Sequence, residues 1–343
     1  MCDGTLCERV VGRVPTARNL VVLALTVLVW GYNWVPLKIA AVAIDPWWFG
    51  AWRIVGGALT LFVALAIARR GLAPPPGRAF VLIGIAQVGG LIAFSTLALR
   101  FGGVANVTAL IFTMPLFTAV FARALLGERL SRARLAWLIV AAAGIAVVAS
   151  GIRTRDEAVG AVLATCGGAS WALGNVLQRR AAYRIDLLRL IAWQQLVAAA
   201  PLLVLALAFG RPVAHFDANV TAAALFAAVV GSGLAWLGWG AALAALPANT
   251  VAPASFAIPV IAAAGAWLQL HAAPAPATDV GLAIVVAGLC GSVLSERRAP
   301  SVAADDAQAA CMVGSPARSR VEIAGAAAGS LVTPPSSNPA RRP

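Results

Sequence analysis

Ten apolar segments, each close to the length that crosses a lipid bilayer, limit most strongly how this chain can fold. They cover residues 20–43, 47–68, 79–99, 103–124, 134–150, 158–178, 187–209, 221–246, 250–270 and 278–294. A helix needs about 20 apolar residues to cross ~30 Å of hydrocarbon. Hydrophobic residues make up 61% of the chain and charged residues only 11%, whereas about a quarter of a soluble domain is charged. We therefore predict an all-α polytopic membrane protein with ten transmembrane helices.

The formal net charge of +13 does not indicate a nucleic-acid partner, because the arginines are sorted by side of the membrane. If the N-terminus is cytoplasmic, sixteen arginines fall on the cytoplasmic side, within residues 9–18, 69–78, 123–134, 179–189 and 297–298. Only four fall outside: Arg100, Arg153, Arg155 and Arg211. This asymmetry follows the positive-inside rule. It predicts a multi-pass protein of the cell (inner) membrane with both termini cytoplasmic and no bound nucleic acid.

A sequence motif near the start of the chain is repeated in its second half. Residues 30–58 align with residues 171–199 at a shift of 141 positions, which places Trp30 on Trp171, Asp45 on Asp186 and Trp52 on Trp193. Further along, the shift is 144, and FTMP at 112–115 aligns with FAIP at 256–259. The chain is therefore predicted to hold two copies of one unit, at 20–150 and 158–294.

Each copy holds five predicted helices, and five is odd, so the second copy must enter the bilayer from the opposite side. Such inverted repeats are typical of transporters that expose one site alternately to the two sides. Duplication without alternating access, as in some channels and membrane enzymes, is the alternative. Residues 1–19 and 299–343 are predicted to be cytoplasmic tails, and the second, rich in Ala, Ser, Pro and Gly, is predicted to be disordered.

The sequence resembles EamA-type members of the drug/metabolite transporter superfamily. The resemblance rests on WGYNWVPLK (30–38), the surroundings of Arg53, NVTALIFTMPLFTAVFARALLGERLS (106–131) and WLIVAAAGIAVV (137–148). It spans residues 20–294 and implies ten helices, cytoplasmic termini and movement of small metabolites, often outward. The second copy departs from this pattern, because LQLHAAPAPA (268–277) has no equivalent of Glu128. We therefore expect the two halves to close differently.

Aromatic and polar side chains form a stripe on the first predicted helix. Trp30, Trp34 and Lys38, the only lysine of the chain, are four residues apart and share a helical face, with Asn33 beside them. Pro36 removes a backbone hydrogen bond and favours a locally opened helix. The stripe is a candidate wall of a central cavity. For Trp34 and Lys38, anchoring at the outer interface is the alternative.

Arg53 lies about two turns into the second predicted helix, and no acidic residue falls in the interior of any predicted helix, Asp279 lying at the start of the last one. An arginine that faces a cavity can bind a substrate carboxylate or phosphate through two hydrogen bonds. The alternatives are hydrogen bonds to carbonyls freed near Pro36, or an ion pair with Asp45. Its counterpart in the second copy is Gln194.

Further candidates for substrate binding are polar or aromatic side chains within predicted helices. They are Gln87, Asn106, Thr113, Trp171, Asn175, Gln178, Gln194 and Trp236. Asn106 and Thr113 are seven residues apart and fall on one helical face. Trp236 either lines a cavity or faces lipid.

The acidic residues Asp45, Glu128, Asp186 and Asp279 all lie near predicted helix ends. A proton-coupled carrier commonly has a carboxylate inside the membrane. The sequence therefore favours a facilitator, an exchanger or a carrier coupled through the charge of its substrate. No cofactor or metal is expected, because the five cysteines are scattered and no phosphate-binding GxxxxGK[ST] motif is present.

The sequence thus predicts a membrane transporter that exports small polar metabolites such as amino acids, and not an enzyme. Its expected partners are a small-molecule substrate and the lipid bilayer, with a homodimer left open. The alternative is a polytopic membrane enzyme acting on lipid-linked substrates. Such an enzyme would need clusters of His, Asp or Glu near one interface, and the predicted loops contain only isolated ones.

Overall fold

The structure, a computed structural model, describes residues 16–128, 130–181, 185–211, 216–246 and 248–298. The predicted tail at 299–343 and residues 1–15 of the predicted tail at 1–19 lie outside these ranges. The helices before residue 152 are α1 (Ala17–Ala43), α2 (Pro46–Ile67), α3 (Ala79–Gly84), η1 (Ile85–Gly90), α4 (Leu91–Phe101), α5 (Val104–Ile111), α6 (Met114–Leu126) and α7 (Arg132–Ser150). Those after it are α8 (Arg155–Ala181), α9 (Leu187–Phe209), α10 (Ala218–Leu225), η2 (Phe226–Leu234), α11 (Ala235–Ala245), α12 (Ala248–Ala254), α13 (Ala257–Leu270) and α14 (Pro276–Arg298).

The helices confirm the predicted all-α membrane fold. In the part of the chain that the structure describes, nine helical segments are long and apolar enough to cross a bilayer, and Ala257–Leu270 is a shorter apolar helix. Every predicted segment is therefore found as helix. The predicted fourth and ninth segments, 103–124 and 250–270, are each divided into two helices, α5 and α6 in the fourth and α12 and α13 in the ninth.

Two spans are broken just before a proline. The first break lies at Phe112 and Thr113, between α5 and α6, and the second at Ser255 and Phe256, between α12 and α13. Pro115 and Pro259 follow these breaks within one turn. A proline has no N–H to bond the carbonyl four residues earlier, here that of Ile111 or Ser255, and its ring clashes with that carbonyl. In contrast, α1 is continuous through Pro36, so the opened helix predicted there is absent.

Two other spans contain a stretch of π-helix. η1 joins α3 to α4, and η2 joins α10 to α11. Both contain a glycine of the 144-residue alignment, Gly89 in η1 and Gly233 in η2, so the two stretches occupy equivalent positions. A π-helix replaces i→i+4 hydrogen bonds by i→i+5 bonds and is frequent at functional sites.

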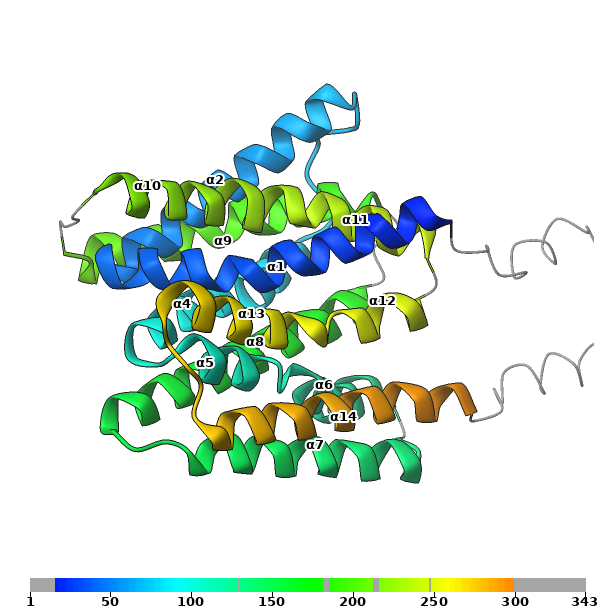
Figure 1. Cartoon of the computed structure of the whole chain (residues 1–343). Helices are drawn as coiled ribbons and strands as arrows, with labels where there is room; N and C mark the ends of the chain where they lie inside the picture. The colour runs from blue at the N-terminus through cyan, green and yellow to red at the C-terminus, as the bar shows by residue number, and fades with distance from the viewer. Residues whose placement is uncertain (1–15, 129, 182–184, 212–215, 247, 299–343) are drawn as a thin grey trace, which may run out of the picture. The chain divides into compact units, whose positions relative to one another are not determined.

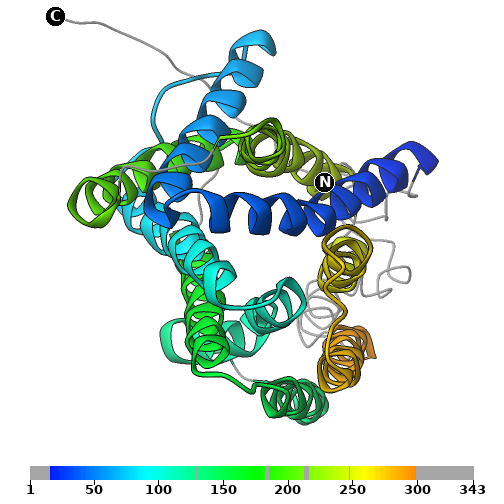
Figure 2. The ribbon, with the colours of Figure 1, turned by 60° about the vertical axis from the view of Figure 1, so that its left-hand side comes forward.

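Helices from the first part of the chain pack mainly on helices from the second part. α1 packs against α13 and α11, α2 against α9 and η2, and α4 against α8. α7 and α14 lie side by side in both ribbon views (Figure 1 and Figure 2). The described chain begins at α1 and ends at α14 on the same end of the bundle, which we call the terminal end (Figure 1).

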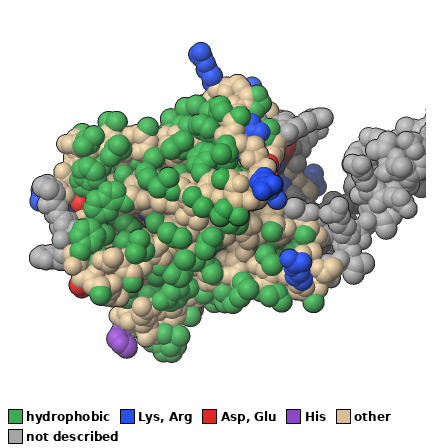
Figure 3. Space-filling view, turned by 90° about the horizontal axis from the view of Figure 1, so that it is seen from above, with side chains coloured by type: hydrophobic (Ala, Val, Ile, Leu, Met, Phe, Trp, Pro, Cys, Tyr) green, Lys and Arg blue, Asp and Glu red, His purple; other side chains and the backbone are tan. Residues whose placement is uncertain are grey.

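The surface agrees with burial in lipid. Large apolar side chains such as Leu59, Val63, Val204 and Leu207 are at least half exposed, all on α2 and α9. Figure 3 shows a face on which hydrophobic side chains cover the middle while Lys and Arg side chains gather toward the terminal end. In water such a surface would be costly, whereas lipid tails cover it at no such cost.

The contact between α7 and α14 depends on small residues. A Cβ atom added at Gly144 would lie 2.7 Å from the backbone nitrogen of Val285. Close backbone approach through small residues is how membrane helices gain packing energy without a hydrophobic driving force.

We predict that Gly144→Val lowers the thermal unfolding midpoint of the detergent-solubilised protein by roughly 2–10 °C, because overpacking costs about 1–3 kcal/mol. Ala143→Val, on the exposed side of the same helix, is the matched control and should change the midpoint by less than about 1 °C. Equal midpoints for the two variants would contradict the described α7–α14 packing.

Candidate functional site

Two adjoining cavities lie inside the bundle. The first, which we call the arginine chamber, has a volume of about 100 Å³ and is lined by residues that include Arg53, Asn33, Trp34, Gln195 and Ser232. The second, the methionine chamber, has a volume of about 260 Å³ and is lined by residues that include Met114, Asn175, Gln178, Leu187 and Leu243. Gln178 lies near the end of α8 and Leu187 begins α9, so the methionine chamber lies between the arginine chamber and the terminal end.

Arg53 brings a positive charge to the arginine chamber without a compensating carboxylate. Its Nε donates a hydrogen bond to Ser232 Oγ at 2.9 Å, and among the described residues no other hydrogen bond or ion pair of its guanidinium is found. Asp45, the predicted alternative partner, instead accepts hydrogen bonds from the backbone of Trp47, Trp48 and Arg211. The terminal amino groups of Arg53 therefore remain available to an anion in the chamber.

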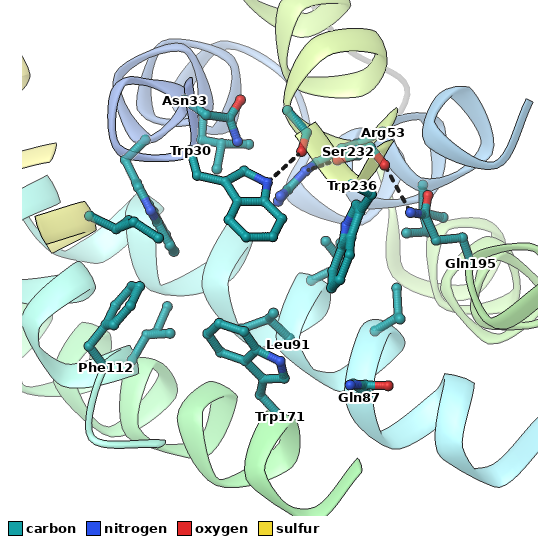
Figure 4. Close-up of a pocket in the computed structure, with 18 residues that line it drawn as sticks. Trp30, Asn33, Arg53, Gln87, Leu91, Phe112, Trp171, Gln195, Ser232 and Trp236 are labelled. Atoms are coloured by element: carbon teal, nitrogen blue, oxygen red, sulfur yellow. Dashed lines mark hydrogen bonds between the residues drawn. The ribbon is translucent and has the colours of Figure 1, made fainter. Parts of the chain in front are cut away.

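Tryptophan side chains from three helices form the wall between the chambers. Trp30, Trp171 and Trp236 line both cavities, and Figure 4 shows their indoles converging with Phe112 around the space below Arg53. Trp30 packs against Trp236 and Trp239 with ring centroids 5.1 Å apart in each pair. Its Nε1 also donates to the backbone oxygen of Gly231 in η2 at 3.0 Å. The π-helix thus supplies a carbonyl that holds the indole in place.

Asn33 and Gln87 each pack closely against a glycine of the other half. A Cβ atom at Gly231 would overlap the amide group of Asn33, and one at Gly174 would overlap Cα and Cβ of Gln87. In the repeat alignments Gly174 is the counterpart of Asn33, and Gly231 is the counterpart of Gln87. Both contacts therefore join an amide residue of the first half to a glycine of the second half. In one contact the amide residue is on α1 and the glycine on η2, and in the equivalent contact the amide residue is on η1 and the glycine on α8.

Two neighbouring glutamines on α9 differ in position, since Gln195 lines a chamber and Gln194 does not. Gln194, the predicted candidate, is buried, and its Nε2 donates to Gln178 Oε1 at 3.0 Å beside the methionine chamber. Gln195 lines the arginine chamber, and its Nε2 donates to the backbone oxygen of Ser232 at 2.8 Å. Asn175, also predicted, lines the methionine chamber and accepts a hydrogen bond from Gln87 Nε2 at 2.5 Å.

Lys38 lies outside the linings of both chambers. Its Nζ donates to the backbone oxygens of Leu99 at 2.5 Å and Gly102 at 3.0 Å, at the C-terminal end of α4. The last carbonyls of a helix lack intrahelical partners and carry partial negative charge. Lys38 therefore fastens α1 to α4 in addition to any anchoring at the outer interface, which was one of its two predicted roles.

Asn106 and Thr113 also lie outside the two linings. Asn106 Oδ1 accepts a hydrogen bond from Thr278 Oγ1 at 2.6 Å, which joins α5 to α14. Thr113 is buried at the break between α5 and α6. Of the twelve predicted site residues, eight line one or both chambers: Trp30, Asn33, Arg53, Gln87, Trp171, Asn175, Gln178 and Trp236.

Sequence reasoning missed Ser232, Gln195 and Met114 as site residues. Ser232 stands in a GSG triplet that indicated close packing, and its small side chain gave no sign of binding Arg53. Gln195 differs from Gln194 by one residue, which is a rotation of about 100° around a helix. Among the described residues no group of three His, Cys, Asp or Glu could hold a metal ion.

The amide–glycine contacts predict an asymmetric pattern of rescue. Gly231→Ala should destabilise the purified protein by several degrees in a thermal unfolding assay, because the new methyl group overlaps Asn33, and Asn33→Ala in the same chain should restore most of the loss. Gly174→Ala should not be restored by Gln87→Ala, because its methyl group also overlaps the Gln87 backbone nitrogen and Cα. Restoration of both or of neither would contradict this geometry.

Comparisons with known proteins place the chain among transporters. The EamA-like transporter family matches residues 18–150 and again residues 158–294. A relative from Salmonella typhimurium named "probable amino-acid metabolite efflux pump" is 27% identical, over 80% of this chain and 94% of that protein. A "probable terminal-alkyne amino-acid exporter" from Streptantibioticus cattleyicolor is 30% identical, over 69% of this chain and 80% of that protein.

The fold has a counterpart among solved structures as well. One crystal structure superposes with a TM-score of 0.62 at 21% sequence identity, over 83% of this chain and all of the other. An uncharacterized transporter of Bacillus subtilis, YvbV, is 27% identical over 81% of this chain and 92% of its own length. The alternative of a membrane enzyme is therefore set aside. The chain belongs to the EamA-like transporter family of the drug/metabolite transporter superfamily, and it is a multi-pass membrane transporter with a small-molecule substrate.

Proposed function

We propose that this transporter exports small polar metabolites of the amino-acid class through the arginine chamber. The observation that carries the proposal is the guanidinium of Arg53, which lines the chamber and has no carboxylate beside it in the part of the chain that the structure describes. A cation in a site shielded from water favours an anion strongly, and a guanidinium matches a carboxylate with two parallel hydrogen bonds. The names of the two amino-acid exporters among the relatives support the same class.

Two amides support a zwitterionic substrate rather than a simple anion. Asn33 and Gln87 both line the arginine chamber, and each keeps a buried side-chain oxygen that has no hydrogen-bond donor among the described residues. An unpaired buried carbonyl oxygen is costly. In the described conformation these oxygens are buried against the protein, so a protonated amino group would provide the missing donor once the amide turns toward the chamber, while the substrate carboxylate binds Arg53.

Residues 20–150 and 158–294 form, in this proposal, two inverted repeats. The packing supports it, because the α1–α13 contact has its counterpart in α8–α6, and the α2–η2 contact has its counterpart in α9–η1. Asp45 and Asp186 are aligned in the repeat, and each provides the N-cap of the helix that follows it. Equivalent helices are thus built and packed in equivalent ways, as a two-fold relation in the membrane plane requires.

Alternating access would require contacts between the two repeats to form and break at each end of the bundle. At the terminal end Arg70 pairs with Asp186 and Arg179 with Glu128, each at 2.7 Å. At the opposite end Asp45 Oδ2 accepts a hydrogen bond from the backbone nitrogen of Arg211 at 3.2 Å. Arg70 and Arg211 are aligned at the shift of 141. The terminal end is the arginine-rich one, so we place it in the cytoplasm and the protein in the inner membrane.

The export proposal predicts the effect of removing the Arg53 charge. In bacteria that express the chain, at least one amino-acid-like metabolite should accumulate in the medium, and Arg53→Ala should reduce its export at least about tenfold, because truncating one partner of a buried charge pair costs several kcal/mol. Mass spectrometry of medium and cell extract at matched protein levels measures this. Arg153→Ala, an exposed arginine at the opposite end, is the control and should export normally. Identical profiles for the unaltered protein, Arg53→Ala and an empty vector would refute the proposal.

The ion pair between Glu128 and Arg179 should hold the terminal end closed. In a variant without native cysteines, a cysteine at Ile191, which is buried and lines the methionine chamber, reports access to that chamber through its rate of maleimide labelling. Glu128→Gln should raise this rate by up to about fivefold, because a partly exposed ion pair contributes at most about 1 kcal/mol. The double reversal Glu128→Arg with Arg179→Glu should return the rate toward its original value. Glu157→Gln, at the opposite end, should leave it unchanged.

A further inference from the structure

We infer that the two chambers are the head-group and side-chain subsites of one substrate site, so that the transported class is amino acids with an extended apolar side chain. This inference rests on the proposed function, because it assumes that Arg53 binds the substrate carboxylate. It adds a second subsite, the methionine chamber, which determines which substrate side chains are accepted.

The two chambers adjoin along a shared wall. Six residues line both: Trp30, Gln87, Phe112, Trp171, Trp236 and Ile258. Figure 4 shows Arg53 and Ser232 on one side of the arginine chamber, with Trp171 and Gln87 on the side away from them. A substrate bound to Arg53 therefore reaches the methionine chamber by extending between the aromatic rings and the Gln87 side chain.

The two amide side chains that line only the methionine chamber, Asn175 and Gln178, already have partners. Asn175 accepts from Gln87 and donates to Met114 Sδ at 3.6 Å, while Gln178 accepts from Gln194. The other side of this chamber consists largely of apolar side chains: Met114, Pro115, Leu187, Ile191, Leu243 and Phe256. The arginine chamber thus offers the charge of Arg53. The methionine chamber offers apolar surface, in which a methionine side chain can adapt to different shapes.

Size also requires both chambers. Small-molecule sites are generally about 300–1,000 Å³, and the arginine chamber has only about 100 Å³. It accommodates the carboxylate and amino group of an amino acid, with little room for a side chain. The methionine chamber adds about 260 Å³, and the two together reach the usual range.

The test measures the affinity of the purified full-length protein, in lipid nanodiscs, for alanine, 2-aminobutyrate, norvaline and norleucine. These amino acids differ by one methylene group at each step, so the dissociation constant should fall about fourfold per step. Met114→Trp fills the methionine chamber and should remove this dependence on length, so that the dissociation constants of alanine and norleucine differ by less than about twofold. Ile191→Phe, on a different helix, should have the same effect, and Leu203→Trp, on the exposed side of α9, is the control.

Each outcome separates this inference from the proposed function. If affinity does not change with length while Arg53→Gln abolishes binding of every member, the inference is wrong and the proposed function stands. If Met114→Trp and Ile191→Phe leave the length dependence intact, the side chain binds elsewhere and the inference is also wrong. If no member binds and Arg53→Gln makes no difference, the proposed function itself fails.

Discussion

A positive charge without a partner at the centre of the bundle is the constraint on which the rest of the site depends. Arg53 lies on α2 between helices that otherwise present apolar or uncharged side chains, and its only hydrogen bond among the described residues goes to Ser232. A charge at membrane depth is costly unless it faces a cavity or a counter-ion. The chamber around Arg53 provides the cavity, and in our account the substrate provides the counter-ion. Substrate binding and neutralisation of the charge are then the same event.

The irregular helices make this chamber possible. In lipid, each backbone group must find a partner inside the protein, so a π-helix is tolerated where side chains bind the carbonyls that it frees. Trp30 donates to Gly231 in η2, and Ser170 Oγ donates to Ala86 in η1 at 2.6 Å. The same stretches contain Gln87 and Ser232, which line the site. The backbone irregularity therefore shapes the cavity and positions the residues that face it.

The helices could be predicted from the sequence, whereas the partners of individual side chains could not. A run of about 20 apolar residues identifies a span without knowledge of its neighbours, and Pro115 marks the break before it. Lys38 binds carbonyls of Leu99 and Gly102, more than sixty positions away, and no local pattern indicates that. Gln195 rather than Gln194 reaches Arg53's chamber because of the rotation of α9, which packing decides. Ser232 was missed for the same reason, because it binds Arg53 only where α2 packs against η2.

The most direct test of this account compares the binding of L-leucine and L-leucinamide to the purified protein by isothermal titration calorimetry. The two ligands differ in the carboxylate, which is the group assigned to Arg53. We expect leucine to bind at least about tenfold more tightly, and we expect Arg53→Gln to abolish this preference, as a direct coupling between the two groups requires. Equal affinities for the two ligands, or a preference that persists in Arg53→Gln, would contradict the claim that Arg53 binds the substrate carboxylate.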